Sequence, residues 1–500
     1  MADQPAATRG YAGFGSFHNE VPVAQMVLAA VPSIPPTAHG SAGFLQYDAA
    51  AVPRTSVLPG ERLAPPASQM VGRVLAEANF DLHLRTSDDR QGWVFLNHGA
   101  FGAPFRHASE CASRWRTHAE RQPLRFFDRE LFEHLVFAIQ DVARYLDVEA
   151  THVALVSNAT EALNAAMAGV PWRGDGTEEA VVLDIGYGGL KKALAVQCER
   201  VNATVRTVGI LREDLLPGDS GGGAGDYGCC GDLEGDMPKL EAKLLAVIDP
   251  HKTRFVLLDH VTSNTAALLP VARLAQAVRR IAPDARIVVD GAHALGALRF
   301  SRGFWDALEA DVYVTNAHKW LCGCRGSAVA IALSSRARDG ELRPLISSHG
   351  AGAGFTSEFI WQGNKDYAPF LALPQVLAFH RTFGDAMARH QRALLRHAER
   401  RLGDVWDVQD VPLIPFANCH PYMACFCLPQ AIQPVDATST DAKAVQDALH
   451  ERFGIECPVK ALFGRLYVRV SAGPYSVEKD IEDLAQAVLE LCGKHRNVLG

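Results

Sequence analysis

From about Phe95 onward, segments with helical spacing of apolar residues alternate with short, continuously apolar segments. Strands are expected at Val153–Val156, Ala180–Asp184, Thr204–Val208, Phe255–Asp259, Ile287–Asp290, Val312–Thr315 and Ala328–Leu333. Helices are expected at Phe105–Glu120, Leu131–Leu146, Gly189–Arg200, Pro238–Ile248 and Val271–Ile281, with a further one opening at Asn158. Strands that are apolar on both faces are typical of sheets covered by helices on both sides. The pattern therefore predicts an α/β fold built on a doubly wound, mostly parallel sheet.

The pattern of apolar and polar residues changes after about Gly350. A long helix is expected at Leu373–Arg401, followed by antiparallel-looking strands at Met423–Leu428 and Leu466–Ser471 and a closing helix at Ser476–Cys492. Since 500 residues exceed what one hydrophobic core usually organises, we expect two domains. Residues 95–350 would form the large domain and residues 351–500 a smaller α+β C-terminal domain, with residues 71–94 as an N-terminal segment.

Two segments show no sustained periodicity of apolar residues. Residues 1–70 are rich in Ala, Pro, Gly and Ser, so we expect a disordered or loosely packed extension. Its few acidic residues leave mitochondrial or plastid targeting open, but it is poor in Arg, and a cytoplasmic location is the expectation. Residues 217–236 include Gly-Gly-Gly-Ala-Gly and are predicted to be a flexible insertion; they lack the Gly-x-x-x-x-Gly-Lys pattern of a nucleotide phosphate loop.

Charge and composition narrow the function classes. The formal net charge is −7, which gives no electrostatic reason to bind nucleic acid or an anionic membrane. The apolar run at residues 21–31 is too short to span a bilayer, which takes about 20 residues. Eleven irregularly spaced cysteines indicate a reducing compartment. The pairs Cys322/Cys324 and Cys425/Cys427 are too closely spaced for a structural zinc site, so we interpret them as buried small residues and expect no metal.

Three short segments carry candidate chemistry. Asp290 ends an apolar strand, Lys319 follows another, and Asn158-Ala159-Thr160 joins a strand to a helix. The carboxyl ends of strands in an open α/β sheet face one crevice, so the three can converge. A lysine amine can condense with the aldehyde of pyridoxal 5'-phosphate (PLP), an aspartate can stabilise its protonated pyridine nitrogen, and a helix N-terminus can bind its phosphate.

Taken singly, each of these residues has an ordinary structural reading, as a turn, a solvated loop charge or a helix cap. Their order and spacing along the chain favour the PLP site over three unrelated structural roles.

A set of ordered motifs points to a family. The motifs are Phe95-Leu-Asn-His-Gly-Ala-Phe-Gly102, Asn158-Ala-Thr160, Asp259-His-Val-Thr-Ser263, Val289-Asp-Gly-Ala-His293, Asn316-Ala-His-Lys-Trp320 and Trp361-Gln-Gly-Asn-Lys-Asp366. From Phe95 to the C-terminus the chain resembles the class V aminotransferase-fold PLP enzymes (fold type I), most closely the isopenicillin N epimerase-like and L-cysteine desulfhydrase-like branch. The motifs are specific for the family but not for the reaction.

The resemblance implies a role for each matching residue. Lys319 would hold PLP as a Schiff base, Asp290 would pair with the pyridine nitrogen, and His293 would approach the phenolic oxygen. The phosphate would lie against Asn158, Ala159, Thr160 and His318, with Asn316 also in the cofactor site and Tyr187 stacked on the ring. Arg469 would clamp the substrate α-carboxylate, and Asn97 and His98 would border the substrate pocket, although a satisfied loop histidine is nearly as good a reading of His98.

The segment Trp361–Asp366 resembles the family motif that reaches the phosphate site of a neighbouring subunit. This chain has Asn364 where the family has Thr, and Asn also donates hydrogen bonds. The resemblance thus implies a homodimer with shared active sites.

The reaction itself stays open between several outcomes. The resemblance favours β-elimination at a C–S bond of an amino acid, giving sulfide or a thiol, pyruvate and ammonia. The alternatives are an amino-acid epimerase, a cysteine desulfurase that uses Cys457 as its nucleophile, and a PLP-fold scaffold without catalysis. The Pro-flanked, apolar setting of Cys457 favours a buried strand cysteine over a nucleophile.

Overall fold

The computed structural model describes residues 23–29, 71–86, 89, 91–218, 236–408 and 411–496. A seven-stranded sheet occupies its centre, in the order β2 (Val153–Val156), β8 (Ala328–Ala332), β7 (Val312–Asn316), β6 (Arg286–Asp290), β5 (Thr253–Asp259), β3 (Glu179–Leu183) and β4 (Thr204–Val208). All neighbours are parallel except that β8 runs antiparallel to both β7 and β2. The mostly parallel α/β sheet predicted from the sequence is confirmed.

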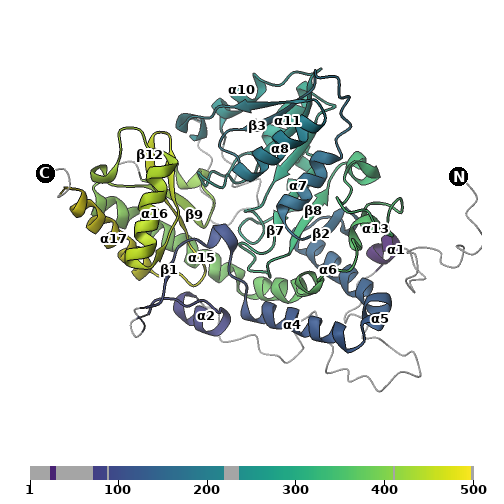
Figure 1. Ribbon diagram of the computed structural model, residues 1–500, viewed down its shortest axis with the longest axis horizontal. Coiled ribbons are helices and arrows are strands. Elements are labelled where there is room, and N and C mark those ends of the chain that lie inside the picture. Colours follow the sequence, from purple (N-terminus) through teal and green to yellow (C-terminus); the bar gives the residue numbers. More distant parts are fainter. Residues whose placement is uncertain are drawn as a thin grey trace, which may run out of the picture.

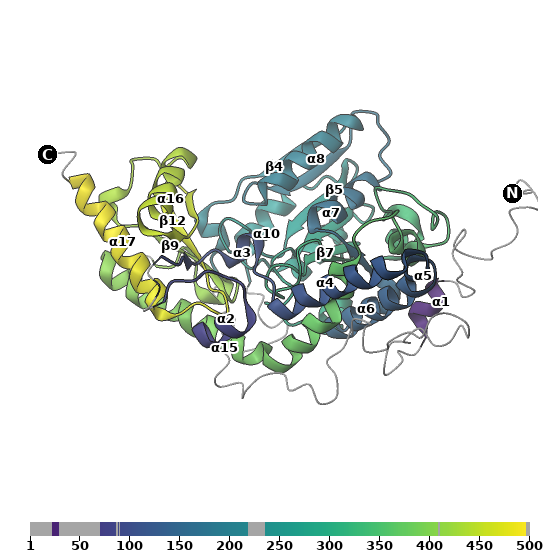
Figure 2. The same ribbon diagram turned by 60° about the horizontal axis from the view of Figure 1, so that its bottom comes forward.

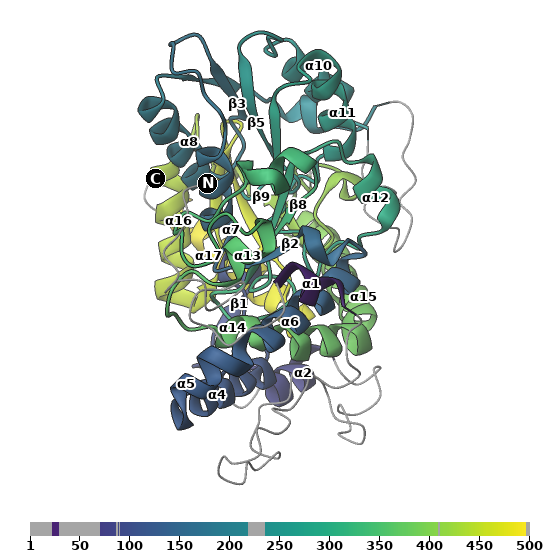
Figure 3. The same cartoon turned by 90° about the vertical axis from the view of Figure 1, so that its right-hand side faces the viewer.

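Helices cover both faces of this sheet, as Figure 3 shows. On one face lie α7 (Ala159–Ala168) and α8 (Gly188–Arg200); on the other lie α6 (Leu131–Leu146), α10 (Pro238–Leu245), α11 (Val271–Ile281) and α12 (Arg302–Ala307). Successive residues of β6 alternate between two cores, with Val288 in one and Ile287 and Val289 in the other. The strands are continuously apolar because each face needs its own buried side chains.

A second, antiparallel sheet has the order β11 (Val459–Leu462), β12 (Arg465–Ser471) and β9 (Met423–Cys427). It packs with α16 (Ser439–Phe453) and α17 (Glu478–Arg496) at one end of the molecule (Figure 1). The helix α15 (Leu373–Trp406) contacts α4 (Arg106–Arg121) and α6, and it also packs against α17, so it links the two sheets (Figure 2). The sequence did not predict α16 or β11.

Short elements complete the described chain. Strand β1 (Val94–Phe95) pairs in parallel with β10 (Ile455–Glu456). The remaining α-helices are α1 (Val23–Leu28), α2 (Gly72–Asn79), α3 (His98–Phe101), α5 (Pro123–Arg125), α13 (Phe355–Ile360) and α14 (Ala368–Leu371). Phe126–Glu130 and Ala337–Glu341 form π-helical turns, and Ala150–His152, Arg212–Leu215, Phe416–Asn418 and Gln430–Ile432 form 3₁₀ turns.

The expected N-terminal extension and insertion fall mostly outside the described residues. Of residues 1–70, only 23–29 are described, and they form α1, which buries Val23 and Val27 against α6. Gln140 Nε2 donates to the carbonyl oxygens of Val27 and Ala29 at 2.9 and 2.8 Å, so this short helix is docked. Residues 219–235 of the insertion lie outside the described part. No helix within the described ranges is long and apolar enough to cross a membrane.

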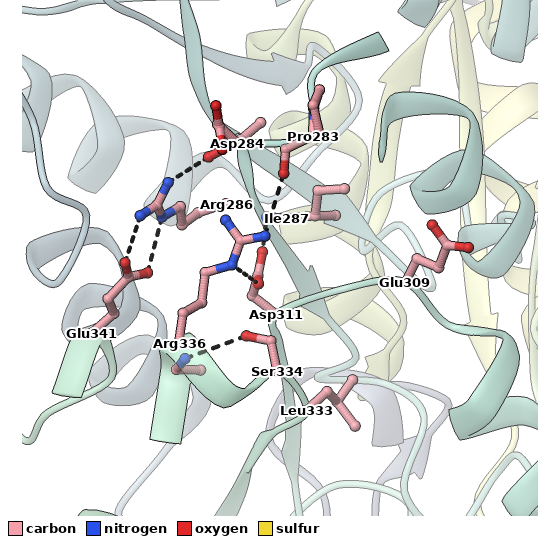
Figure 4. Close-up of polar contacts among 12 residues, drawn as sticks. Pro283, Asp284, Arg286, Ile287, Glu309, Asp311, Leu333, Ser334, Arg336 and Glu341 are labelled. Carbon is pink, nitrogen blue, oxygen red and sulfur yellow. Dashed lines mark hydrogen bonds and ion pairs between the residues drawn. The ribbon is translucent and has the colours of Figure 1, made fainter. Parts of the chain in front are cut away.

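An ion-pair cluster closes the amino-terminal edge of the central sheet (Figure 4). Asp311, just before β7, is 2% exposed and accepts hydrogen bonds from Arg279 Nη2 and Ile287 N, both at 2.9 Å. Arg336 Nε lies 3.1 Å from the same carboxylate. This cluster lies at the strand ends opposite the candidate site, so it fixes β6, β7 and β8 to one another without lining that site.

Candidate active site

Lys319 lies beyond the carboxyl end of β7, three residues after Asn316. Its Nζ is 3.1 Å from Nε2 of His293. Burial lowers the pKa of the Lys319 ammonium from 10.5 to about 8, and the positive charge of Arg469 adds to this, while Asp290 opposes it. Near neutral pH an appreciable fraction of Lys319 is therefore the free amine that can act as a nucleophile or a base.

His293 is held so that it can share a hydrogen bond with that amine. Trp320 Nε1 donates to His293 Nδ1 at 3.4 Å, so the ring proton lies on Nε2, towards Lys319. Burial, and then the charge of Lys319, hold the pKa of His293 well below its usual value, so the ring is neutral. His420, which is fully buried, lies with Nε2 2.8 Å from the backbone oxygen of His293 and fixes the loop.

Two carboxyl groups end neighbouring strands beside Lys319. Asp290 at the end of β6 and Asp259 at the end of β5 are register partners, and both are buried. Asp290 accepts a hydrogen bond from Ala292 N at 2.9 Å, and burial raises its pKa. Burial, followed by the nearby charge of Asp290, raises the pKa of Asp259 to about 8.

Asp259 occurs in one of the sequence motifs, but its role was not predicted from the sequence. Its Oδ1 accepts a hydrogen bond from Tyr187 N at 3.2 Å, and its Oδ2 is buried without a partner. A Cβ at Gly186 would lie 2.7 Å from that Oδ2, so only glycine lets the loop pass this close. Asp259 therefore anchors the loop that carries Tyr187, whose side chain is half-exposed at the rim.

The start of α7 meets the end of β7. Asn158 caps α7 by accepting a hydrogen bond from Glu161 N at 2.9 Å, and Ala159 N donates to Asn316 Oδ1 at 2.9 Å. Thr160 in the first turn is exposed. Nδ1 of His318 is buried and has no hydrogen-bond partner among the described residues. The helix-end amides of α7 therefore lie at the end of β7, the strand that leads to Lys319.

Arg469 on β12 is the cation of the site. It is 3% exposed, its Nη2 donates to Asn97 Oδ1 at 3.2 Å, and its Nη1 contacts Ser263 Oγ at 3.5 Å. Its Nε has no partner, and no carboxylate is paired with it in the part of the chain that the structure describes. An unpaired buried cation is costly, so this geometry suits an anionic ligand such as a carboxylate.

Three residues with expected roles have different surroundings. His98 is fully buried, with Nδ1 2.9 Å from Tyr475 OH and Nε2 3.0 Å from Lys319 O, so both ring nitrogens have partners and the ring supports the Lys319 backbone. Asn364 is exposed and lines a separate cavity of about 450 Å³ with Trp115 and Phe127. Cys457 is fully buried.

The residues present fit pyridoxal phosphate on structural grounds. Its aldehyde suits the amine of Lys319, its pyridine nitrogen suits the carboxyl of Asp290, and its phosphate suits the first amides of α7, which Asn316 joins to the end of β7. The buried Nδ1 of His318 is a further polar atom next to Lys319 in the chain. No group of three or more His, Cys, Asp or Glu residues that could hold a metal occurs among the described residues. The nine cysteines described, including both Cys-x-Cys pairs, are buried, which confirms their interpretation as small buried residues.

Known proteins resemble the chain in sequence and in fold. Residues 235–484 match the family described as Aminotransferase class-V. The chain is 28% identical to isopenicillin N epimerase of Streptomyces clavuligerus over 80% of this chain and 95% of that protein. It is 24% identical to L-cysteine desulfhydrase of Arabidopsis thaliana over 86% and 93%, respectively. The solved complex of the cystine C–S lyase C-DES with cysteine persulfide superposes with a TM-score of 0.62 at 20% identity, covering 79% of this chain and 97% of that one. The chain belongs to the class V aminotransferase family of pyridoxal-phosphate enzymes.

Proposed function

We propose that this enzyme is a C–S lyase that acts on cysteine or a related β-thio amino acid. The overall reaction converts L-cysteine and water into hydrogen sulfide, pyruvate and ammonia. In this proposal Lys319 binds the cofactor and then serves as the base for the α-proton. Asp290 pairs with the pyridine nitrogen, and Arg469 with Asn97 binds the α-carboxylate. The L-cysteine desulfhydrases among the relatives support this choice of reaction.

The rest of the cofactor site follows from the same geometry. Asn158, Ala159, Thr160 and His318 would hold the phosphate, Asn316 would align the start of α7, and Tyr187 would cover the ring. His293 would contact the phenolic oxygen from its position beside Lys319. Bound there, the cofactor withdraws electrons from the substrate Cα and weakens its C–H bond.

The pairing of Lys319 with a neutral His293 is the observation that carries the proposal. The two side chains are 3.1 Å apart, and both pKa values are lowered, so Lys319 can remove a proton near neutral pH. When the α-proton leaves, its electron pair moves towards the β-carbon and the C–S bond breaks. The sulfur leaves as a thiol or sulfide, and the three-carbon product is hydrolysed to pyruvate and ammonia.

A desulfurase needs a thiolate nucleophile within reach of the substrate sulfur, and Cys457 is a poor one. Burial raises the pKa of its thiol far above the usual value, and its Sγ lies 3.8 Å from the backbone oxygen of Arg469. Cys425, opposite Arg469 on β9, is also buried, and its pKa is raised to about 12. Neither cysteine forms a thiolate near neutral pH, which favours the lyase.

The proposal extends to a homodimer. Asn364 is exposed and separate from the Lys319 group of its own subunit, which suits a contact with the phosphate site of a second copy. Arg116 and Asp366 form an ion pair 2.9 Å apart that braces this segment. The many buried cysteines suit a reducing compartment, so we place the enzyme in the cytoplasm.

The test is to incubate the PLP-loaded enzyme with L-cysteine and to measure sulfide, pyruvate and alanine together. The wild type is expected to form sulfide and pyruvate in equal amounts. Lys319→Ala should lose this activity, and Cys457→Ala should keep it. Alanine with sulfur transfer that depends on Cys457 would instead establish a desulfurase. The first relative named above is an epimerase, so α-proton exchange in deuterated water without sulfide release would establish racemisation.

A further inference from the structure

A second cation lies on the same face of the small sheet as Arg469. Lys460 on β11 is the register partner of Tyr467 on β12, and Tyr467 and Arg469 are two residues apart on one strand. Side chains of such residues point to the same face of an antiparallel sheet. Lys460 and Arg469 are therefore diagonal neighbours, a relation that separates the residues by roughly 7–8 Å.

This face looks towards the candidate active site. Arg469 reaches Ser263 and Asn97 from it, and Cys425, which is directly opposite Arg469 on β9, contacts Asn264 O at 3.3 Å. Val468 and Val470 point to the other face of β12, and both are fully buried. Lys460 therefore stands beside Arg469 on the substrate side of the sheet.

The charge on this face is not balanced. Lys460 is partly buried, and its ammonium has no hydrogen bond or ion pair in the described ranges. Burial, and then the positive charge of Arg469, lower the pKa of Lys460. The neighbouring Tyr467 and Cys425 have pKa values raised to about 12, so neither supplies a negative charge near neutral pH. Two cations thus share a partly buried face without an anion, and an anionic ligand would offset that cost.

We propose that Lys460 binds a second carboxylate of the substrate, so that the enzyme prefers β-thio amino acids whose sulfur substituent ends in a carboxylate. The α-carboxylate would lie on Arg469 and the distal carboxylate on Lys460. The diagonal spacing of the two residues on the sheet suits two carboxylates joined by a few bonds, as in a cysteine thioether. This inference rests on the proposed function only for the reaction; the recognition of two carboxylates does not depend on elimination.

The decisive comparison uses two substrates that differ by one charge. S-carboxymethyl-L-cysteine and S-carbamoylmethyl-L-cysteine have the same shape, but only the first carries a distal carboxylate. The PLP-loaded wild-type enzyme is expected to have a kcat/KM for the acid that is roughly tenfold to a hundredfold higher, the effect of one charge-assisted hydrogen bond. Lys460→Met should bring the ratio close to one, and Lys460→Arg should restore most of it.

Controls separate this effect from general loss of charge or fold. Lys443→Met removes an exposed lysine of α16 that pairs with Asp447, and it should leave the ratio as in the wild type. Melting temperatures of all variants show whether each is folded. A ratio near one in the wild type, or an equal loss on both substrates in Lys460→Met, would overturn the proposal. If Lys460→Met does not fold, Lys460→Gln takes its place.

A binding experiment distinguishes failure of this inference from failure of the lyase proposal. L-Glutamate and L-glutamine have no β-leaving group, and their affinities for the PLP-loaded enzyme can be measured by calorimetry and by the absorbance of the bound cofactor. Tighter binding of glutamate that depends on Lys460 would support the inference even if neither thioether released pyruvate. Equal binding of the two amino acids by the wild type would refute it.

Discussion

The substitution Asp259→Asn should change how stability depends on pH. Asparagine keeps an oxygen that can accept the hydrogen bond from Tyr187 N, but it cannot ionise. In the folded protein the pKa of Asp259 is raised to about 8, because the carboxyl is buried and faces Asp290. In the unfolded chain the same carboxyl has its ordinary pKa of 3.8. Between these values the folded state binds a proton that the unfolded state has lost, so the wild type loses stability as the pH rises.

The size of this loss follows from proton linkage. At pH 6 a carboxyl with a folded pKa of about 8 is almost fully protonated, and at pH 8 it is about half protonated. Integration between these two pH values gives a loss of about 2 kcal/mol of unfolding free energy that the wild type suffers and Asp259→Asn does not. Groups that do not face Asp259 titrate alike in both proteins, so the difference between variant and wild type reports on Asp259 together with its neighbour Asp290.

The assay is denaturant unfolding of the cofactor-free proteins at pH 6, 7 and 8. The variant should gain about 2 kcal/mol on the wild type between pH 6 and pH 8. Asp306→Asn, at an exposed position of α12, serves as the control and should follow the wild type. If wild type and Asp259→Asn lose the same free energy over this range, Asp259 is ionised in the folded protein at pH 6, and the reasoning about the paired carboxyls is wrong.

Three further predictions concern other parts of the molecule. Uptake of PLP by the cofactor-free protein requires the free amine of Lys319, so its rate should rise about tenfold per pH unit below about pH 8 and then level off. Stopped-flow absorbance measures this rate. A rate independent of pH would contradict the lowered pKa of Lys319. Asp311→Asn removes the charged acceptor shared by Arg279 and Arg336, and denaturant unfolding should show a loss of about 3 kcal/mol of stability. The value of kcat should stay near that of the wild type, because this cluster lies at the strand ends opposite Lys319. Cys457→Ala should leave the yield of sulfide per pyruvate unchanged, and a loss of sulfide alone would return the desulfurase to consideration.

The sequence predicted the central sheet because each of its strands carries its own signal. Leu131–Leu146, Val153–Val156, Thr204–Val208 and Val271–Ile281 are found with the predicted bounds. The small sheet was harder to predict. Strand β11 is only half-buried, and the buried residues of α16 are few, so neither has a strong apolar period. Packing against β12 and α17 stabilises these elements, and such contacts between distant segments are not visible in a local pattern.

The candidate site shows the same division between local and long-range information. Lys319, Asp290 and Asn158 each follow a strand, so the rule about carboxyl ends places them together. Asp259 also ends a strand, but its raised pKa depends partly on Asp290 lying opposite it. The register between β5 and β6 decides this, and the sequence does not show that register. The two histidines His98 and His420 hold backbone oxygens near Lys319 and cannot be told from ordinary core histidines in the sequence.

The electrostatic design of the site is divided between the two sheets. The central sheet supplies both carboxyl groups, Asp259 and Asp290, and the small sheet supplies both cations, Arg469 and Lys460. Charged groups from both sheets act on Lys319, because Asp290 raises its pKa while Arg469 lowers it. Any change in how closely the small sheet approaches the central one must therefore alter the charge state of Lys319. Burial is the main cause of the lowered pKa of Lys319, and the charge of Arg469 adds to it. A substrate that neutralises Arg469 removes this second contribution, so substrate binding itself should make Lys319 a stronger base at the moment when it must take up the α-proton.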